Sequence, residues 1–99
     1  IARRQRQMCI RDRTVCSFYD ISMEDIKGRS RKREIVLARQ IAMYIAKEYT
    51  DASLIAIGRE VGRRDHTTVL YATRSVKDVM DTSPIVKQQV AEISQLLNL

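Results

Sequence analysis

The sequence is poor in the residues that build disulfides and metal sites. It has one histidine, His66, and two cysteines, Cys9 and Cys16. If these cysteines share a helix, they lie about 10.5 Å apart along its axis at about 1.5 Å per residue. A disulfide needs a Cα–Cα distance below about 7 Å, and one histidine with two cysteines cannot supply a four-ligand zinc site. We therefore expect reduced cysteines, a cytoplasmic protein and no metal or other cofactor.

Long apolar runs are also absent. A membrane-spanning helix needs about 20 consecutive apolar residues, whereas the apolar residues here, 44% of the chain, occur in shorter groups. The chain begins Ile1-Ala2-Arg3-Arg4 without an apolar stretch behind it, so we expect no signal peptide. Because it does not begin with methionine, we expect a fragment or a processed chain. Its 99 residues fit one domain.

Residues that break helices are few. There is one proline, Pro84, and there are three glycines, Gly28, Gly58 and Gly62. No stretch alternates between apolar and polar residues over five or more positions, so strands are not expected. The sequence predicts an all-α fold, a bundle of about five to six helices.

The expected helices lie between these breaks. They cover residues up to about 19, a short helix between Ser22 and Gly28, about 31–49, Leu54 to about Gly62, a helix from His66 capped by Asp65, and 85–97. Gly28 is expected in the left-handed conformation that often ends a helix. The helix at 31–49 is apolar on nearly all sides and should be central. The expected inward faces are Val69, Ala72, Val76 and Val79, and in the last helix Ile85, Val86, Val90, Ile93, Leu96 and Leu97.

The positive charge is concentrated in the first half of the chain. Residues 1–50 hold twelve Lys and Arg against six Asp and Glu, whereas residues 51–99 hold six of each. The excess is greatest in the basic segment, residues 27–33, with five cations and no acid. A solvent-exposed loop without a binding partner explains such a run equally well. The functional alternative is a segment that binds a polyanionic partner. Nucleic acid is the first candidate and an acidic membrane surface the second.

Two short helices joined by a glycine-containing turn form a helix-turn-helix pattern at residues 54–62 and from 66 onward. In that motif the first residues of the second helix face the DNA bases. Here they are Asp65, His66, Thr67 and Thr68. Asp accepts a hydrogen bond from cytosine, and Thr can bond a base or contact the methyl group of thymine. An ordinary helix N-terminus has a similar composition, and this alternative stays open from the pattern alone.

Longer stretches give a family resemblance. They are Gly62 to Ala72, Ser30 to Arg33, Ala38 to Tyr44, Ser53-Leu54 and Ile57-Gly58. In this order and spacing, over about residues 15–99, the chain resembles the C-terminal DNA-binding domain of the DnaA family of bacterial replication initiators. The resemblance implies a Trp-repressor-like helix-turn-helix bundle that binds double-stranded DNA at DnaA boxes in the replication origin.

The resemblance also implies roles for individual residues. Base contacts are expected from Arg31 in the minor groove and from Asp65, His66, Thr67 and Ile55. Phosphate contacts are expected from Arg33, Arg39, Gln40, Lys47, Thr68 and Arg64. Residues 1–28 would form a connecting helix and a short helix, and residues 29–99 the DNA-binding domain. The domain itself would be monomeric and not catalytic, with the ATPase domain upstream in the full-length protein. The N-terminal helix could contact acidic phospholipid.

Three positions depart from the family pattern. Arg63 stands where many members have a second glycine, which puts the turn geometry in question. Ile55 stands where some members have a proline that touches a thymine methyl, so Ile55 is an apolar substitute. The segment Met8 to Arg13 matches nothing in the pattern, and we assign it no role.

Other functions fit the residues less well. Asp65 and His66 resemble part of a hydrolase site, but neighbouring residues on a helix point about 100° apart and cannot form a triad. The chain also lacks a Gly-rich phosphate loop ending in Lys-Ser or Lys-Thr. A helix-turn-helix transcription regulator binding a different operator is the main alternative. It would normally dimerise on a palindromic site.

Overall fold

The computed structural model describes residues 13–49, 52–62 and 64–97, and within these ranges all regular structure is helical. The helices cover residues 13–19, α2 (Met23–Lys27), α3 (Arg33–Tyr49), α4 (Leu54–Glu60), α5 (His66–Thr82) and α6 (Pro84–Leu96). The all-α helix-turn-helix bundle expected from the sequence is therefore confirmed. None of the described helices is long and apolar enough to span a membrane.

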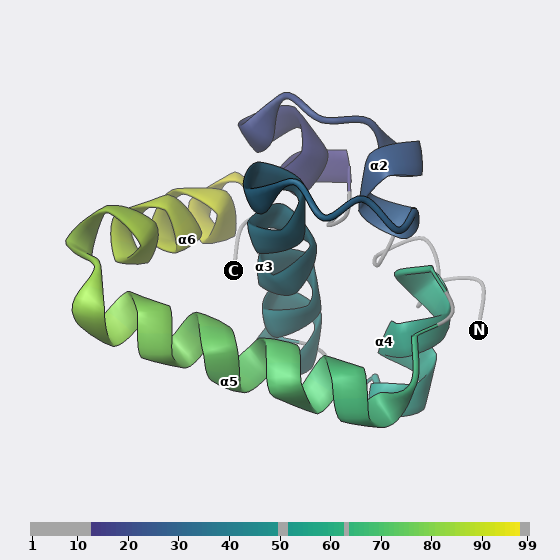
Figure 1. Cartoon of the computed structure of the whole chain (residues 1–99). Helices are drawn as coiled ribbons and strands as arrows, with labels where there is room; N and C mark the ends of the chain where they lie inside the picture. The colour runs from purple at the N-terminus through teal and green to yellow at the C-terminus, as the bar shows by residue number, and fades with distance from the viewer. Residues whose placement is uncertain (1–12, 50–51, 63, 98–99) are drawn as a thin grey trace.

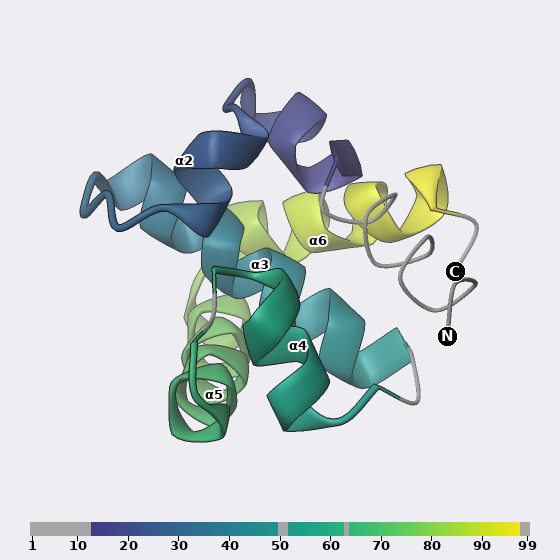
Figure 2. The same ribbon diagram turned by 90° about the vertical axis from the view of Figure 1, so that its right-hand side faces the viewer.

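Helix α3 is the centre of the molecule (Figure 1). Helix α5 runs across one end of α3, α4 lies beside the start of α5, and α6 folds back from the end of α5 (Figures 1 and 2). Helix α3 contacts α2, α4 and α5. Its buried residues are Ile35, Ala38, Arg39, Ile41, Ala42, Met43, Ile45 and Ala46. Because these residues cover most of its circumference, α3 packs on several sides, as its composition predicted.

The buried apolar side chains form two clusters. The larger joins Val15, Cys16 and Ile26 to residues of α3, α5 and α6. The boundary expected at residue 28 thus falls between segments that share a core. The smaller cluster joins the second half of α3 to α4 and the start of α5, through Met43, Ala46, Ala52, Ile57, Val61, Val69 and Ala72. This smaller cluster supports the helix-turn-helix.

Side-chain caps set the starts of four helices. Ser22, Ser53, Asp65 and Ser83 each accept a hydrogen bond from the backbone N–H three residues later. Such a bond satisfies one of the N–H groups that the first turn of a helix leaves without a partner. Ser83 also donates its own N–H to the carbonyl of Val79 at the end of α5. Local sequence therefore defines where α4 and α5, the two helices of the motif, begin.

The prediction for Gly28 is wrong in one respect. Helix α2 ends there as expected, but Gly28 has φ −83° and ψ −162°, which is extended and not left-handed. A Cβ at Gly28 would lie 2.9 Å from the carbonyl oxygen of Glu24, so close contact with the preceding turn favours glycine. Gly62 is the described glycine with positive φ, +83°.

The expected apolar face of α6 is also partly wrong. Val86, Val90 and Ile93 are buried in the larger cluster, but Ile85 and Leu96 are exposed. Six apolar residues in thirteen positions cannot all lie on one face of a helix. The residues near the middle of the inward face are buried in the core, and others stay exposed. On α5, the inward stripe holds for Val69, Ala72 and Val76, with Val79 half-buried.

Candidate nucleic-acid interface

Helices α4 and α5 approach each other closely at Gly58. The N–H of Arg64 donates to the carbonyl of Gly58 at 2.7 Å. A Cβ at Gly58 would lie 1.9 Å from the carbonyl oxygen of Arg64 and 3.4 Å from a methyl group of Val69. The chain leading into α5 therefore lies directly against α4, and glycine at position 58 makes this possible.

The first turn of α5 presents polar side chains to solvent. Asp65, His66, Thr67 and Thr68 are all exposed. The Oδ1 atom of Asp65 accepts from the backbone N–H of Thr68 at 2.8 Å. Hydrogen bonds from the backbone and side chain of Thr68 lower the pKa of the Asp65 carboxyl below its ordinary value, so Asp65 is ionised at neutral pH. The cap thereby fixes the orientation of a hydrogen-bond acceptor at the tip of the helix.

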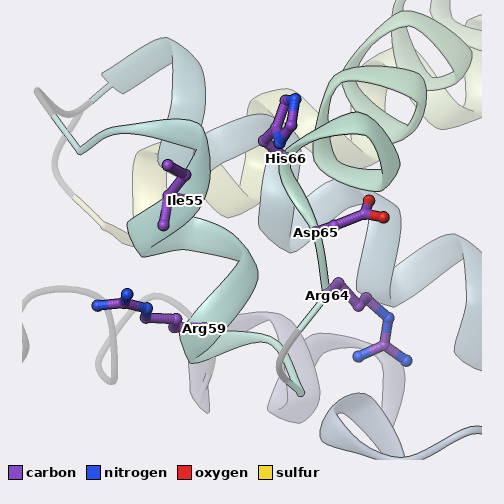
Figure 3. A pocket seen from close by; sticks show the side chains of 5 residues that line it. All are labelled: Ile55, Arg59, Arg64, Asp65 and His66. Carbon is purple, nitrogen blue, oxygen red and sulfur yellow. The ribbon is translucent and has the colours of Figure 1, made fainter.

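A hollow of about 570 Å³ lies between α4 and the start of α5 (Figure 3). It is lined by Ile55, Arg59, Arg64, Asp65 and His66. Ile55 and Arg59 project from α4, whereas Arg64 points away from both of them (Figure 3). Ile55 is 56% exposed despite its apolar side chain, so it is available to a ligand beside His66. We call this the α4 hollow.

A second hollow joins the basic segment to the start of α5. Its lining residues are Arg29, Ser30, Arg31, Val36, Arg39, Gly62, Arg64, Asp65 and Thr68. We call it the loop hollow. It brings Arg31, the expected minor-groove residue, to the same concave surface as Asp65 and Thr68. Residues more than thirty positions apart in the sequence thus meet at one site.

Arg39 lies inside the protein. It is 7% exposed, and its guanidinium donates to three carbonyl oxygens. Nε bonds Ile26 at 2.8 Å, Nη1 bonds Ser30 at 3.2 Å and Nη2 bonds Asp25 at 2.9 Å. Burial lowers the pKa of Arg39. This geometry gives no support to the expected phosphate contact.

Arg64 is half-buried and has a similar arrangement. Its Nη1 donates to the carbonyl of Val61 and its Nη2 to the carbonyl of Gly28. Burial lowers the pKa of Arg64, and the nearby charges of Arg39 and Arg29 lower it further. Arg64 therefore faces the basic segment, although it also lines both hollows.

The remaining phosphate candidates on α3 share one side of that helix. Arg33, Gln40 and Lys47 are spaced by seven residues, which is close to two helical turns. Arg33 and Lys47 are exposed and Gln40 is half-buried. They form a polar stripe along α3 that is compatible with contacts to a nucleic-acid backbone.

Comparison with known proteins identifies the family. Residues 12–76 match the family described as bacterial DnaA protein helix-turn-helix. This chain belongs to the DnaA helix-turn-helix family. Two relatives, both chromosomal replication initiator proteins DnaA, illustrate the match. That of Enterococcus faecalis is 43% identical over 84 residues, covering 85% of this chain and 19% of the relative. That of Bacteroides thetaiotaomicron is 46% identical over 85 residues, covering 86% of this chain and 18% of the relative. The chain spans about a fifth of the length of the curated relatives it matches.

Some surface residues of this DnaA-family domain escaped the sequence analysis. Tyr71 is 68% exposed and lies one helical turn after Thr67, on the same face of α5. Arg59 lies one turn after Ile55 on α4 and lines the α4 hollow. Arg29, by contrast, belongs to the basic segment singled out from the sequence, and it is exposed beside Arg64. Helical spacing from Thr67 and Ile55 could have indicated the first two.

Several expectations for this DnaA-family domain fall on residues that the structure does not describe. Arg63, Cys9 and the segment 8–12 are among them, as is most of the N-terminal helix expected to contact phospholipid. Within the described ranges, no group of three or more His, Cys, Asp and Glu side chains is placed to hold a metal ion.

Proposed function

We propose that this chain binds double-stranded DNA in a sequence-specific manner, at DnaA boxes of a replication origin. The observation that supports it best is the loop hollow, where the exposed first turn of α5 and the basic segment share one surface. A helix N-terminus enters a major groove, and a cationic loop beside it can reach the neighbouring backbone or minor groove. Membership in the DnaA helix-turn-helix family agrees with this function.

The bases would be read by side chains at the start of α5. Asp65 offers an ionised acceptor to the exocyclic amine of cytosine, and His66 and Thr67 offer hydrogen-bonding groups to base edges. Ile55 would contact a thymine methyl group from the α4 hollow. Arg31 would enter the minor groove, where a narrow groove attracts guanidinium groups.

The backbone would be held by a different set of residues. Arg33, Gln40 and Lys47 on α3, with Thr68 on α5, are the proposed phosphate contacts. Such contacts fix the protein on the duplex but carry no sequence information directly. The cationic members of both sets, Arg31, Arg33 and Lys47, all lie in the first half of the chain, where the excess positive charge is concentrated.

The relatives support a proposal for the role of this chain in a whole protein. The matched relatives are named chromosomal replication initiator proteins, and this chain matches about a fifth of their length. We propose that it serves as the DNA-binding domain of such an initiator, and that the ATPase activity belongs to another part of the full-length protein. On its own, the domain would bind DNA as a monomer and would not catalyse a reaction.

The function is tested by selecting bound duplexes from a random pool with the purified domain at a stated salt concentration. We expect one short asymmetric site bound by one copy of the domain. A palindromic site bound by a dimer would instead support the transcription regulator. If no sequence is enriched over the pool, the proposal of sequence-specific binding is wrong.

A further inference from the structure

Two arginines hold the backbone that leads from α2 into α3. Arg39 donates to the carbonyls of Asp25, Ile26 and Ser30. Arg64, which comes from the turn before α5, donates to the carbonyl of Gly28. Four carbonyl groups within six residues thus accept hydrogen bonds from two side chains. The basic segment has no helix or strand of its own between residues 28 and 32, so these bonds fix its path.

The turn before α5 also touches this backbone directly. A Cβ at Gly62 would lie 2.2 Å from the carbonyl oxygen of Lys27 and 2.3 Å from Nη1 of Arg64. Gly62 has φ +83°, a conformation that glycine adopts without the strain other residues incur. The helix-turn-helix turn and the end of α2 are therefore packed backbone to backbone, with Arg64 beside the contact.

This arrangement gathers like charges. Burial lowers the pKa of both Arg39 and Arg64, and the nearby charges of Arg39 and Arg29 lower the pKa of Arg64 further. Burying guanidinium groups that repel one another costs free energy. The hydrogen bonds to carbonyls offset that cost, and their result is a fixed path for the segment that carries Arg29 and Arg31, both exposed.

We propose that Arg39 and Arg64 are positioning residues that hold the basic segment in register with the recognition helix α5. They would act through Arg31 and its neighbours, and not by touching phosphate themselves. Contacts from α5 and from the basic segment would then form as one unit. This inference rests on the proposed DNA binding, but the order of the basic segment can be measured without DNA.

The proposal requires arginine at these positions. A guanidinium has several N–H donors in one plane and can reach Val61 and Gly28 together, whereas a lysine ammonium on its flexible stem cannot reproduce this fork. Arg64→Lys therefore removes the positioning while keeping the charge. Arg13→Lys is the matched control, because Arg13 is exposed on the helix at residues 13–19 and belongs to none of the proposed DNA contacts.

The first measurement uses the free protein. Backbone 15N order parameters of residues 28–31 should fall in Arg64→Lys and stay unchanged in Arg13→Lys, with thermal unfolding confirming that each variant is folded. Arg64→Gln, whose shorter side chain cannot bond both carbonyls together, should also show a decrease and replaces the lysine variant if that one does not fold. Unchanged order parameters in the Arg64 variants would overturn the proposal.

The second measurement is a double-mutant cycle on the selected DNA site. Arg64→Lys should weaken binding about fivefold or more in the normal background, the lower range of coupling between two sites. In an Arg31→Ala background the same change should have little effect, because the residue it positions is gone. A simple structural role would weaken binding equally in both backgrounds, and that result would reject the proposal.

The two arms separate the failure of this inference from the failure of the proposed function. If the unmodified domain selects no sequence, the proposed DNA recognition fails, whatever the order parameters show. If Arg64→Lys loosens residues 28–31 but leaves binding to the selected site unchanged, positioning has no part in recognition and the inference is wrong.

Discussion

In the first turn of α5, neighbouring side chains have different surroundings. Asp65 is held by its hydrogen bond to Thr68 and lines both hollows, whereas His66 lines the α4 hollow alone and Thr67 is exposed beside them in sequence. Thr67→Ala should therefore weaken binding to the selected site by about 1–3 kcal/mol and have little effect on random DNA. Fluorescence anisotropy with both duplexes would measure this. Equal losses of binding affinity for the selected duplex and for random DNA would refute a base-reading role for Thr67.

At the same scale, Tyr19 gives a prediction about stability and pH. Its Oη donates to Oε1 of Gln89 at 3.0 Å, and burial raises the pKa of Tyr19 from 10.0 to about 12. Between these values the unfolded chain loses its phenolic proton before the folded one. The stability provided by Tyr19 is therefore present below pH 10 and is lost as the pH rises toward 12.

Tyr19→Phe should isolate this effect. At neutral pH the variant should be less stable by about 1 kcal/mol, because a hydrogen bond is lost. Urea unfolding from pH 7 to above pH 11 should show the difference narrowing under alkaline conditions, since only the parent chain has this phenol to ionise. A difference that stays constant across the pH series would contradict the prediction.

The residue scale also shows which site features a sequence can reveal. The caps Ser53 and Asp65 were predictable, because a cap depends on residues within one helical turn. The inward direction of the Arg39 and Arg64 side chains was not predictable, and both residues were expected to contact phosphate. Whether a guanidinium faces solvent or carbonyls depends on how α2, α3 and the turn before α5 meet, which involves residues far apart in sequence.

At the scale of elements, the crossing of α4 and α5 depends on Gly58. An added methyl group would lie 1.9 Å from a backbone oxygen, and a backbone atom cannot move aside as a side chain can. Gly58→Ala should destabilise the domain by about 1–3 kcal/mol or more, the cost of overpacking, despite the higher helix propensity of alanine.

Arg59→Ala is the control for this prediction. It is the next residue of α4 and is exposed, so its stability should change by no more than about 0.5 kcal/mol. Thermal unfolding of the two variants gives the comparison. If Gly58→Ala is as stable as Arg59→Ala, the close approach at Gly58 does not determine how α4 and α5 pack.

The sequence predicted where the helices begin more accurately than it predicted which of their side chains are buried. Helix α5 begins after its predicted cap, α4 begins at the expected Leu54, and α3 is central as its composition indicated. The predictions of a left-handed Gly28 and of buried Ile85 and Leu96 side chains were wrong. These depend on the approach of other segments, and helical periodicity carries no information about which apolar residues the core leaves uncovered.

At the scale of the whole molecule, the two hydrophobic clusters meet along α3, which links the basic segment at its start to the helix-turn-helix at its end. Both proposed DNA-contacting parts are thus attached to one central helix. This arrangement would let the proposed contacts in two grooves depend on one central helix, and the hydrogen bonds of Arg39 and Arg64 lie in the same region.

The salt dependence of DNA binding tests this view of the whole molecule. The logarithm of the binding constant falls with the logarithm of salt concentration with a slope of about −0.9 per phosphate contact. If Arg31, Arg33, Lys47, Arg39 and Arg64 all neutralised phosphates, the slope would be about −4.5. Because the guanidinium groups of Arg39 and Arg64 bond carbonyls, three of these five cations remain, and we expect a slope of about −2.7. Titrations over a series of salt concentrations distinguish the two slopes. A slope near −4.5 would indicate that Arg39 and Arg64 also contact phosphates of the DNA.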